Sequence, residues 1–132
     1  MDIFNKLRDM NILLIDDDEW IRHSMSILFE YEGCRLHAIE TAEEGLEELK
    51  GRDYELIIVD YKLPGMDGLE FLKRSQKTHP DAMKILITAY GSREITSEAY
   101  KLGVRDIINK PFTAEAVEES LKRLIKERDQ TI

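Results

Sequence analysis

Residues 12–20 read ILLIDDDEW, an apolar run followed at once by three aspartates and a glutamate. Consecutive apolar residues without alternation are typical of a strand buried on both faces, as in a parallel sheet. The acids at its end repel one another, by about 4 kcal/mol for two charges ~4 Å apart at an effective dielectric constant near 20. We therefore expect either a bound cation at this strand end or acids that are solvated and cap a helix.

Four further runs resemble this one, and helical patterns separate them. The predicted strands are Asn11–Ile15, Cys34–Ala38, Glu55–Val59, Lys84–Thr88 and Arg105–Asn109. Between and after them apolar residues recur at helical spacing, most clearly at Val117, Leu121 and Leu124. A strand and a helix repeated five times, with right-handed crossovers, predict an α/β fold: a doubly wound parallel five-stranded sheet with helices on both faces.

Length and charge limit the classes of function. The chain has 132 residues, which suits one domain, and its 42% hydrophobic and 35% charged content is typical of a globular protein. Because 27 acids outnumber 19 bases, nucleic acid is not expected as a direct ligand. No apolar run approaches the ~20 residues that span a bilayer. With a single cysteine, Cys34, and no signal-peptide pattern, the sequence predicts a cytoplasmic protein without a membrane role.

The predicted organisation is a short N-terminal extension over residues 1–10, one domain over residues 11–128, and a C-terminal tail over residues 129–132. Four apolar residues of the extension can form one face of a short helix: Ile3, Phe4, Leu7 and Met10. We expect this segment to be partly ordered and to pack lightly on the domain.

Chemically active side chains stand at the ends of four predicted strands. Asp16 and Asp17 follow the first, Asp60 the third, Thr88 ends the fourth, and Lys110 follows the fifth. Ligands bind at the carboxyl ends of the strands in such sheets, so these groups are expected to converge. Clustered carboxylates suit Mg²⁺, and a carboxylate beside such a metal can attack phosphorus. The lysine and the threonine can then pair with phosphoryl oxygens.

These residues lie in motifs similar to those of response-regulator receiver domains of two-component signalling. The motifs are ILLIDDDE, IIVDYKLPGMDG, ILITAYG and NKPF, in the order and spacing of that family, and the resemblance runs from about Asn11 to Glu127. It implies a CheY-like, flavodoxin-like (βα)5 fold with strand order 2-1-3-4-5 and a site between the first and third strands.

The resemblance also implies individual roles. Asp60 is the expected phosphoacceptor, and Asp16, Asp17 and Asp60 are expected to hold Mg²⁺ together with the backbone carbonyl of Lys62. In such a domain a sensor histidine kinase or a phosphotransfer protein donates the phosphoryl group.

Two further residues complete the implied site. Thr88 is the expected switch hydroxyl and Lys110 the phosphate-pairing lysine, with a cis peptide bond before Pro111. Phosphorylation is expected to switch the face formed by the last two helices and the strand between them, and so to control a downstream protein or an output domain. The expected protein is a signalling switch that assists its own phosphorylation and dephosphorylation, not a turnover enzyme. A phosphorylation-dependent homodimer, and the choice between a stand-alone protein and a fragment of a longer regulator, stay open.

Three other functions compete with this interpretation. Asp16 and Asp18 with Thr88 and Lys110 also resemble haloacid-dehalogenase-type phosphatases, in which Asp16 is the nucleophile. That alternative leaves Asp60 without a role and lacks an acidic metal motif after the lysine. A non-phosphorylated interaction module on the same fold is expected to lack one of the acids or the lysine, and this chain has them all. A flavin protein is expected to have a Gly-rich or Ser-rich phosphate-binding loop after the first strand, where this chain has acids.

Neighbouring residues have simpler predicted roles. Asp18 and Glu19 are expected to cap the first long helix and to favour its dipole. Trp20 is expected to pack near the start of that helix. Thr41 and Thr113 are predicted N-caps of later helices.

The chain departs from the family at the position three residues before Lys110, where an aromatic residue is usual and Ile107 stands here. Isoleucine cannot make the ring movement that normally follows the threonine. We therefore hypothesise that Tyr90, or motion of the loop that contains it, carries the switch. A second hypothesis is that the bulk of Lys62 and Tyr90 slows hydrolysis of the acyl phosphate.

Overall fold

One parallel sheet organises residues 2–130, the part of the chain that the computed structural model describes. Its strands are β1 (Asn11–Ile15), β2 (Arg35–Ile39), β3 (Leu56–Asp60), β4 (Met83–Thr88) and β5 (Asp106–Asn109). They lie in the order β2-β1-β3-β4-β5, and each neighbouring pair is parallel. The predicted fold class and strand order are therefore confirmed.

Two predicted strands begin and end one residue too early. Cys34 does not begin β2, because its N–H donates to the Phe29 carbonyl and closes the end of the preceding helix. Asp60 belongs to β3, because it pairs in the ladder with Ile87 of β4. The phosphoacceptor candidate is thus the last residue of a central strand.

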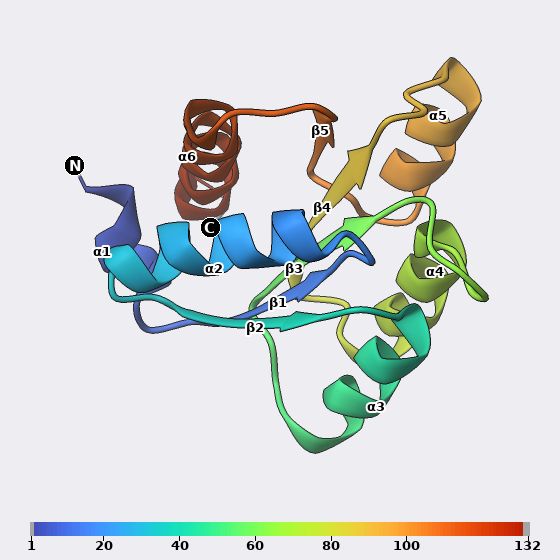
Figure 1. Cartoon of the computed structure of the whole chain (residues 1–132), viewed down its shortest axis with the longest axis horizontal. Coiled ribbons are helices and arrows are strands. Elements are labelled where there is room, and N and C mark those ends of the chain that lie inside the picture. Colours follow the sequence, from blue (N-terminus) through green and yellow to red (C-terminus); the bar gives the residue numbers. More distant parts are fainter. Residues whose placement is uncertain (1, 131–132) are drawn as a thin grey trace.

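Helices cover both faces of the sheet (Figure 1). They are α1 (Ile3–Leu7), α2 (Glu19–Tyr31), α3 (Ala42–Gly51), α4 (Gly68–Thr78), α5 (Arg93–Lys101) and α6 (Ala114–Gln130). α1, α2 and α6 lie on one face, and α3, α4 and α5 lie on the other. None of the helices within residues 2–130 is long and apolar enough to cross a membrane.

Successive strand residues point into two separate cores. Ile12 and Leu14 of β1 join the core beneath α2 and α6, whereas Leu13 and Ile15 join the core beneath α3, α4 and α5. Because both faces are buried, the strand cannot alternate between apolar and polar residues. This explains the continuous apolar runs of the sequence.

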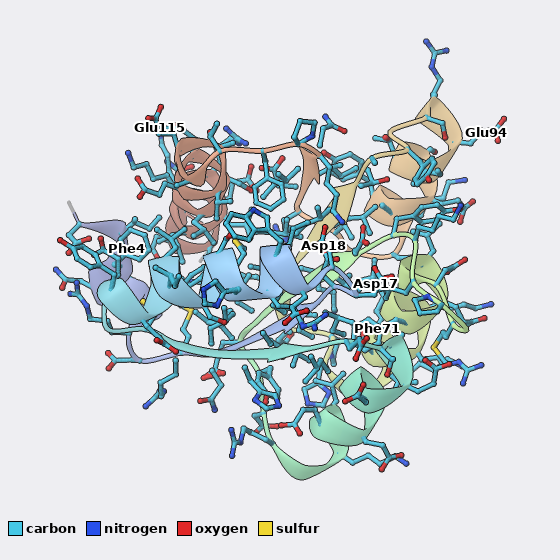
Figure 2. The ribbon with its side chains drawn as sticks, in the orientation of Figure 1. Phe4, Asp17, Asp18, Phe71, Glu94 and Glu115 are labelled. Carbon is cyan, nitrogen blue, oxygen red and sulfur yellow. The ribbon has the colours of Figure 1, made fainter. Side chains whose placement is uncertain are left out.

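The N-terminal segment is part of the first core, so the expectation of light packing is wrong. Its four apolar residues are at most 8% exposed: Ile3, Phe4, Leu7 and Met10. The Phe4 ring packs edge-on against Phe29 of α2, with centroids 6.3 Å apart, and Lys6 pairs with Asp129 near the end of α6. α1 therefore joins the ends of two longer helices. Figure 2 shows Phe4 at the end of the molecule opposite Asp17 and the acidic strand edge.

The predicted helix caps are confirmed. Thr41 Oγ1 accepts a hydrogen bond from the Glu44 N–H, and Thr113 Oγ1 accepts one from the Ala116 N–H, each at 3.1 Å. The Glu44 carboxylate accepts from the Thr41 hydroxyl at 3.0 Å. Thr41 and Glu44 therefore form a reciprocal pair of hydrogen bonds at the start of α3.

Candidate functional site

The predicted convergence at the carboxyl edge of the sheet is confirmed. Asp16, directly after β1, is fully buried, and Asp60, at the end of the adjacent β3, is 5% exposed. Lys110 follows β5, and its Nζ lies 3.0 Å from Asp16 Oδ2 and 3.1 Å from Asp60 Oδ2. One ammonium group therefore bridges two buried carboxylates that are far apart in the sequence.

A third acid leaves the cluster with excess negative charge. Carboxylate oxygens of Asp16, Asp17 and Asp60 all lie within 4.8 Å of one another. At this spacing and an effective dielectric constant near 20, each pair of charges repels by about 3 kcal/mol. The single positive charge of Lys110 cannot neutralise three carboxylates.

The pKa values of the cluster reflect burial and crowding. Burial, helped by the nearby Asp16 charge, raises the pKa of Asp60 to about 6 in spite of Lys110. Burial likewise raises the pKa of Asp16, against the effect of a hydrogen bond from the Asp18 N–H. Although burial alone lowers it, the pKa of Lys110 is raised because Asp16 and Asp60 stabilise its charged form. The site thus disfavours negative charge unless a further cation is supplied.

One carboxylate oxygen of the cluster has an ion-pair partner but no further polar partner in the described part of the chain. Asp16 Oδ2 is buried and makes no hydrogen bond in the described part of the chain. Lys110 Nζ lies 3.0 Å away, so the contact is an ion pair without hydrogen-bond geometry. A buried carboxylate oxygen normally has a hydrogen-bond partner or a metal. The three hard oxygen donors of Asp16, Asp17 and Asp60, within 4.8 Å of one another, fit a divalent cation.

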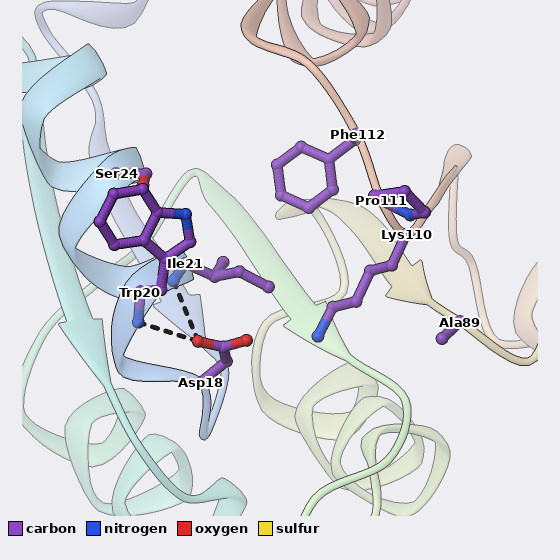
Figure 3. Close-up of a pocket in the computed structure, with 8 residues that line it drawn as sticks. All are labelled: Asp18, Trp20, Ile21, Ser24, Ala89, Lys110, Pro111 and Phe112. Carbon is purple, nitrogen blue, oxygen red and sulfur yellow. Dashed lines mark hydrogen bonds between the residues drawn. The ribbon is translucent and has the colours of Figure 1, made fainter.

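Local structure at the end of β1 separates the acids into two groups, as the sequence predicted. Asp16 Oδ1 accepts a hydrogen bond from the Asp18 N–H at 2.9 Å, which turns the chain away from the strand. Asp18 Oδ1 accepts from the N–H groups of Trp20 and Ile21 and caps α2, as Figure 3 shows. Arg22 donates to the Asp16 carbonyl at 2.8 Å and fixes the turn. Asp16 and Asp17 face the site, whereas Asp18 is a capping residue.

Thr88 and Lys110 are joined through their backbones. The Lys110 N–H donates to the Thr88 carbonyl at 2.9 Å, and the Lys110–Pro111 peptide bond is cis, as the resemblance implied. The Thr88 side chain is buried, and its Oγ1 accepts a hydrogen bond from the Tyr90 N–H at 2.8 Å. The hydroxyl hydrogen of Thr88 stays available as a donor.

The loops after β3 and β4 meet in a cluster that the sequence indicated only in part. Lys62 Nζ lies 4.9 Å from the centre of the Tyr90 ring. Tyr61 packs against the same ring, with centroids 6.5 Å apart and planes at 63°. Sequence reasoning singled out Lys62 and Tyr90 but missed Tyr61, and nothing in the spacing of these residues could have found the contact.

A groove of about 420 Å³ opens beside the acidic cluster. Eight residues line it: Asp18, Trp20, Ile21, Ser24, Ala89, Lys110, Pro111 and Phe112 (Figure 3). Trp20 is 74% exposed, so the expectation that it packs near the start of α2 is wrong. The buried face of α2 is formed by Met25 and Phe29, and Trp20 stands outside it.

Comparisons with known proteins agree on one family. The model of the response regulator receiver domain matches residues 12–122. Sporulation initiation phosphotransferase F of Bacillus subtilis is 30% identical over 114 residues, which are 86% of this chain and 92% of that protein. A CheY-like response regulator receiver domain protein from Methanospirillum hungatei has a TM-score of 0.86 at 32% identity, covering 92% of this chain and 97% of that structure.

Several other relatives are longer. The chain spans 32% of the transcriptional regulatory protein YesN of Bacillus subtilis and 26% of the C4-dicarboxylate transport transcriptional regulatory protein DctD of Rhizobium meliloti. The similarity is thus to one module of those proteins. With the sheet order, the buried acids and the bridging lysine on the same edge, the comparisons lead to one conclusion: the chain belongs to the response regulator receiver domain family.

Proposed function

We propose that Asp60 accepts a phosphoryl group, that Asp16, Asp17 and Asp60 hold Mg²⁺ with the Lys62 backbone carbonyl, and that Lys110 pairs with the phosphoryl oxygens. The observation that carries the proposal is the cluster of three carboxylates, two of them buried, with one lysine that bridges Asp16 and Asp60. When bound, Mg²⁺ neutralises charge on the carboxylates and on the phosphoryl oxygens.

The transfer itself needs little from the protein beyond position and charge. An Asp60 carboxylate oxygen attacks phosphorus in line with the bond from phosphorus to the donor histidine nitrogen. The new O–P bond forms as the N–P bond breaks, and the electron pair stays on the histidine nitrogen. Lys110 Nζ, 3.1 Å from Asp60 Oδ2, lies where negative charge gathers in the product. The Thr88 hydroxyl hydrogen can turn toward a phosphoryl oxygen while its oxygen still accepts from Tyr90.

The groove beside Lys110 supports a protein as the phosphoryl donor, a sensor histidine kinase or a phosphotransfer protein. Its Trp20 wall continues along the outer side of α2 as a stripe of exposed apolar residues: Trp20 at 74%, Ile27 at 55% and Tyr31 at 87%. Such a stripe beside a functional site is typical of a protein contact. A donor seated on this stripe and in the groove reaches Asp60 past Lys110.

In this role the domain is a signalling switch that assists its own phosphorylation and hydrolysis. The added charge biases a pre-existing equilibrium of the surface formed by α5, β5 and α6. That surface then selects a downstream protein, an output domain or a second copy of the chain. The haloacid-dehalogenase-type alternative is not favoured, because the family match and the central place of Asp60 both support the receiver function.

Acetyl phosphate with Mg²⁺, followed by mass spectrometry of peptides, tests the proposal. We expect one phosphoryl group on Asp60 in the wild type and none in Asp60→Asn. Asp53→Asn is the control, because the Asp53 side chain is fully exposed and lies outside the cluster. Label on Asp16 would instead support the phosphatase, and label that persists in Asp60→Asn would refute the assignment of the acceptor.

A further inference from the structure

Lys62 and Tyr90 form a contact between the two loops that border Asp60. Lys62 lies two residues after Asp60, and its ammonium stands over the Tyr90 ring, 4.9 Å from the centre. Tyr61 also packs against this ring, edge to face, with centroids 6.5 Å apart. Tyr90 is 52% exposed, so this contact is a surface cation–π pair, which we call the Lys62–Tyr90 clamp.

The clamp is connected to the switch hydroxyl. The Tyr90 N–H donates to Thr88 Oγ1 at 2.8 Å. In the described part of the chain, the carbonyl of Tyr90 accepts from the Ser92 N–H at 2.7 Å, which is a local turn contact. Movement of the Thr88 side chain is therefore transmitted to Tyr90, whose ring is held by Lys62 and Tyr61.

Phosphorylation changes what Lys62 prefers to contact. The phosphoryl group carries a charge of about −1.5 to −2, in place of the single negative charge of the Asp60 carboxylate. Its three oxygens accept strong hydrogen bonds. Lys110 already bridges Asp16 and Asp60 and is shared between them. For a flexible lysine chain two residues away, a charge-assisted hydrogen bond to a phosphoryl oxygen is stronger than a cation–π contact at an exposed site.

We propose that the Lys62–Tyr90 clamp is the switch of this chain: on phosphorylation Lys62 leaves the Tyr90 ring for the phosphoryl group and so frees the β4–α5 loop to follow Thr88. This rests on the proposed phosphorylation of Asp60. It replaces the ring movement that Ile107 cannot make, because Ile107 is a half-buried aliphatic residue packed in the core beneath α5. In this chain the Tyr90 ring stays on the β4–α5 loop, and the Lys62 ammonium moves away from it.

Nuclear magnetic resonance of the whole chain tests the exchange. In the unphosphorylated protein the Tyr90 ring current should shift the ε-methylene protons of Lys62 upfield, and Tyr90→Leu should abolish that shift. Acetyl phosphate with Mg²⁺ should abolish it in the wild type, while Mg²⁺ alone should leave it unchanged. Lys101, on α5, is the control lysine, because its Nζ lies 3.9 Å from Glu98 and away from the clamp.

A second variant separates the clamp from general loop motion. Lys62→Met keeps an apolar side chain against Tyr90 but removes the charge. We expect its β4–α5 amide shifts on phosphorylation to fall by at least half relative to the wild type, and Lys62→Arg to restore them.

The mass of the intact protein, measured on each sample, reports how much phosphoryl group is bound. If Asp60 carries no phosphoryl group, the proposed function fails and the clamp with it. If Asp60 is phosphorylated while Lys62 keeps its upfield shift, only the clamp is overturned. The clamp is also overturned if Mg²⁺ alone releases Lys62, or if Lys62→Met responds like the wild type.

Discussion

Replacing Asp60 by Asn should stabilise the metal-free protein although it removes the proposed phosphoacceptor. Asp60 is 5% exposed and shares a 4.8 Å cluster with Asp16 and Asp17, so its negative charge is unfavourable in the folded state. An amide of nearly the same shape removes that charge and leaves Lys110 with Asp16 as its remaining acid contact.

The size of the effect follows from the pKa of Asp60. Folding raises this pKa from 3.8 to about 6. A rise of about two pH units corresponds to about 3 kcal/mol of folding free energy at neutral pH, which is an upper bound for the gain on removing the charge. The pKa of about 6 already includes the favourable contact with Lys110, so we expect Asp60→Asn to raise the unfolding free energy by up to about 3 kcal/mol at neutral pH.

The sign of the pH dependence is fixed by the direction of the shift. Because the folded protein binds the Asp60 proton more tightly, the contribution of Asp60 to stability is most favourable below pH 4 and is lost as the pH rises through about 6. The advantage of Asp60→Asn should therefore be about twice as large at pH 7.5 as at pH 5. Mg²⁺ should also reduce it, because a bound cation stabilises the native wild type and the variant has lost one ligand.

Urea unfolding at pH 5 and pH 7.5, with EDTA or with Mg²⁺, measures all four conditions. Asp53→Asn is the matched control, with an expected change within about 0.5 kcal/mol, because its side chain is fully exposed. Equal or lower stability of Asp60→Asn than of the wild type, at pH 7.5 in EDTA, would show that the acids do not destabilise the metal-free protein.

Three further predictions test other parts of the molecule. Lys110→Met should destabilise the metal-free protein by about 3 kcal/mol in urea unfolding, because it leaves buried Asp16 and Asp60 without their cation. Mg²⁺ should recover much of this stability, and an unchanged unfolding free energy would mean that the bridge is unimportant. Trp20→Ser should slow phosphoryl transfer from a phosphorylated histidine phosphotransfer protein at least tenfold, since about 1.4 kcal/mol of lost contact free energy gives a factor of ten. Labelling by acetyl phosphate should be unchanged, and equal slowing with both donors would contradict a docking role for Trp20. Phe4→Ala should lower the unfolding free energy by about 3 kcal/mol, because Phe4 is 5% exposed and packs against Phe29; a change below about 0.5 kcal/mol would show that α1 is not part of the core.

The sequence determined the strands because burial on both faces leaves a direct trace in it. Ile12 to Ile15 and Leu56 to Val59 are apolar without interruption, and all of these residues are fully buried. The division of ILLIDDDEW into site acids and a capping acid was also predictable, because a capping residue is recognised from local position alone. The hydrogen bonds from Trp20 and Ile21 to Asp18 bear this out.

Other features depend on residues that are distant in the chain. α1 has five residues, too few to be stable alone, and it is helical because α2 and α6 bury its apolar face. No local pattern distinguishes such a segment from a loosely attached extension. Trp20 is similar, since its exposure depends on which face of α2 meets the sheet, and Met25 and Phe29 occupy that face.

The parallel α/β architecture and the residues at the strand ends could be predicted from the amino-acid pattern and its motifs, because burial periodicity and short-range spacing are local properties. The contacts of Lys110 with Asp16 and Asp60, and of Lys62 with Tyr90, depend instead on how the chain folds in three dimensions. Each of these contacts joins segments that meet only when strands distant in sequence become neighbours in the sheet. Distances of a few ångströms between the charged groups of these segments set the charge balance on which the chemistry depends.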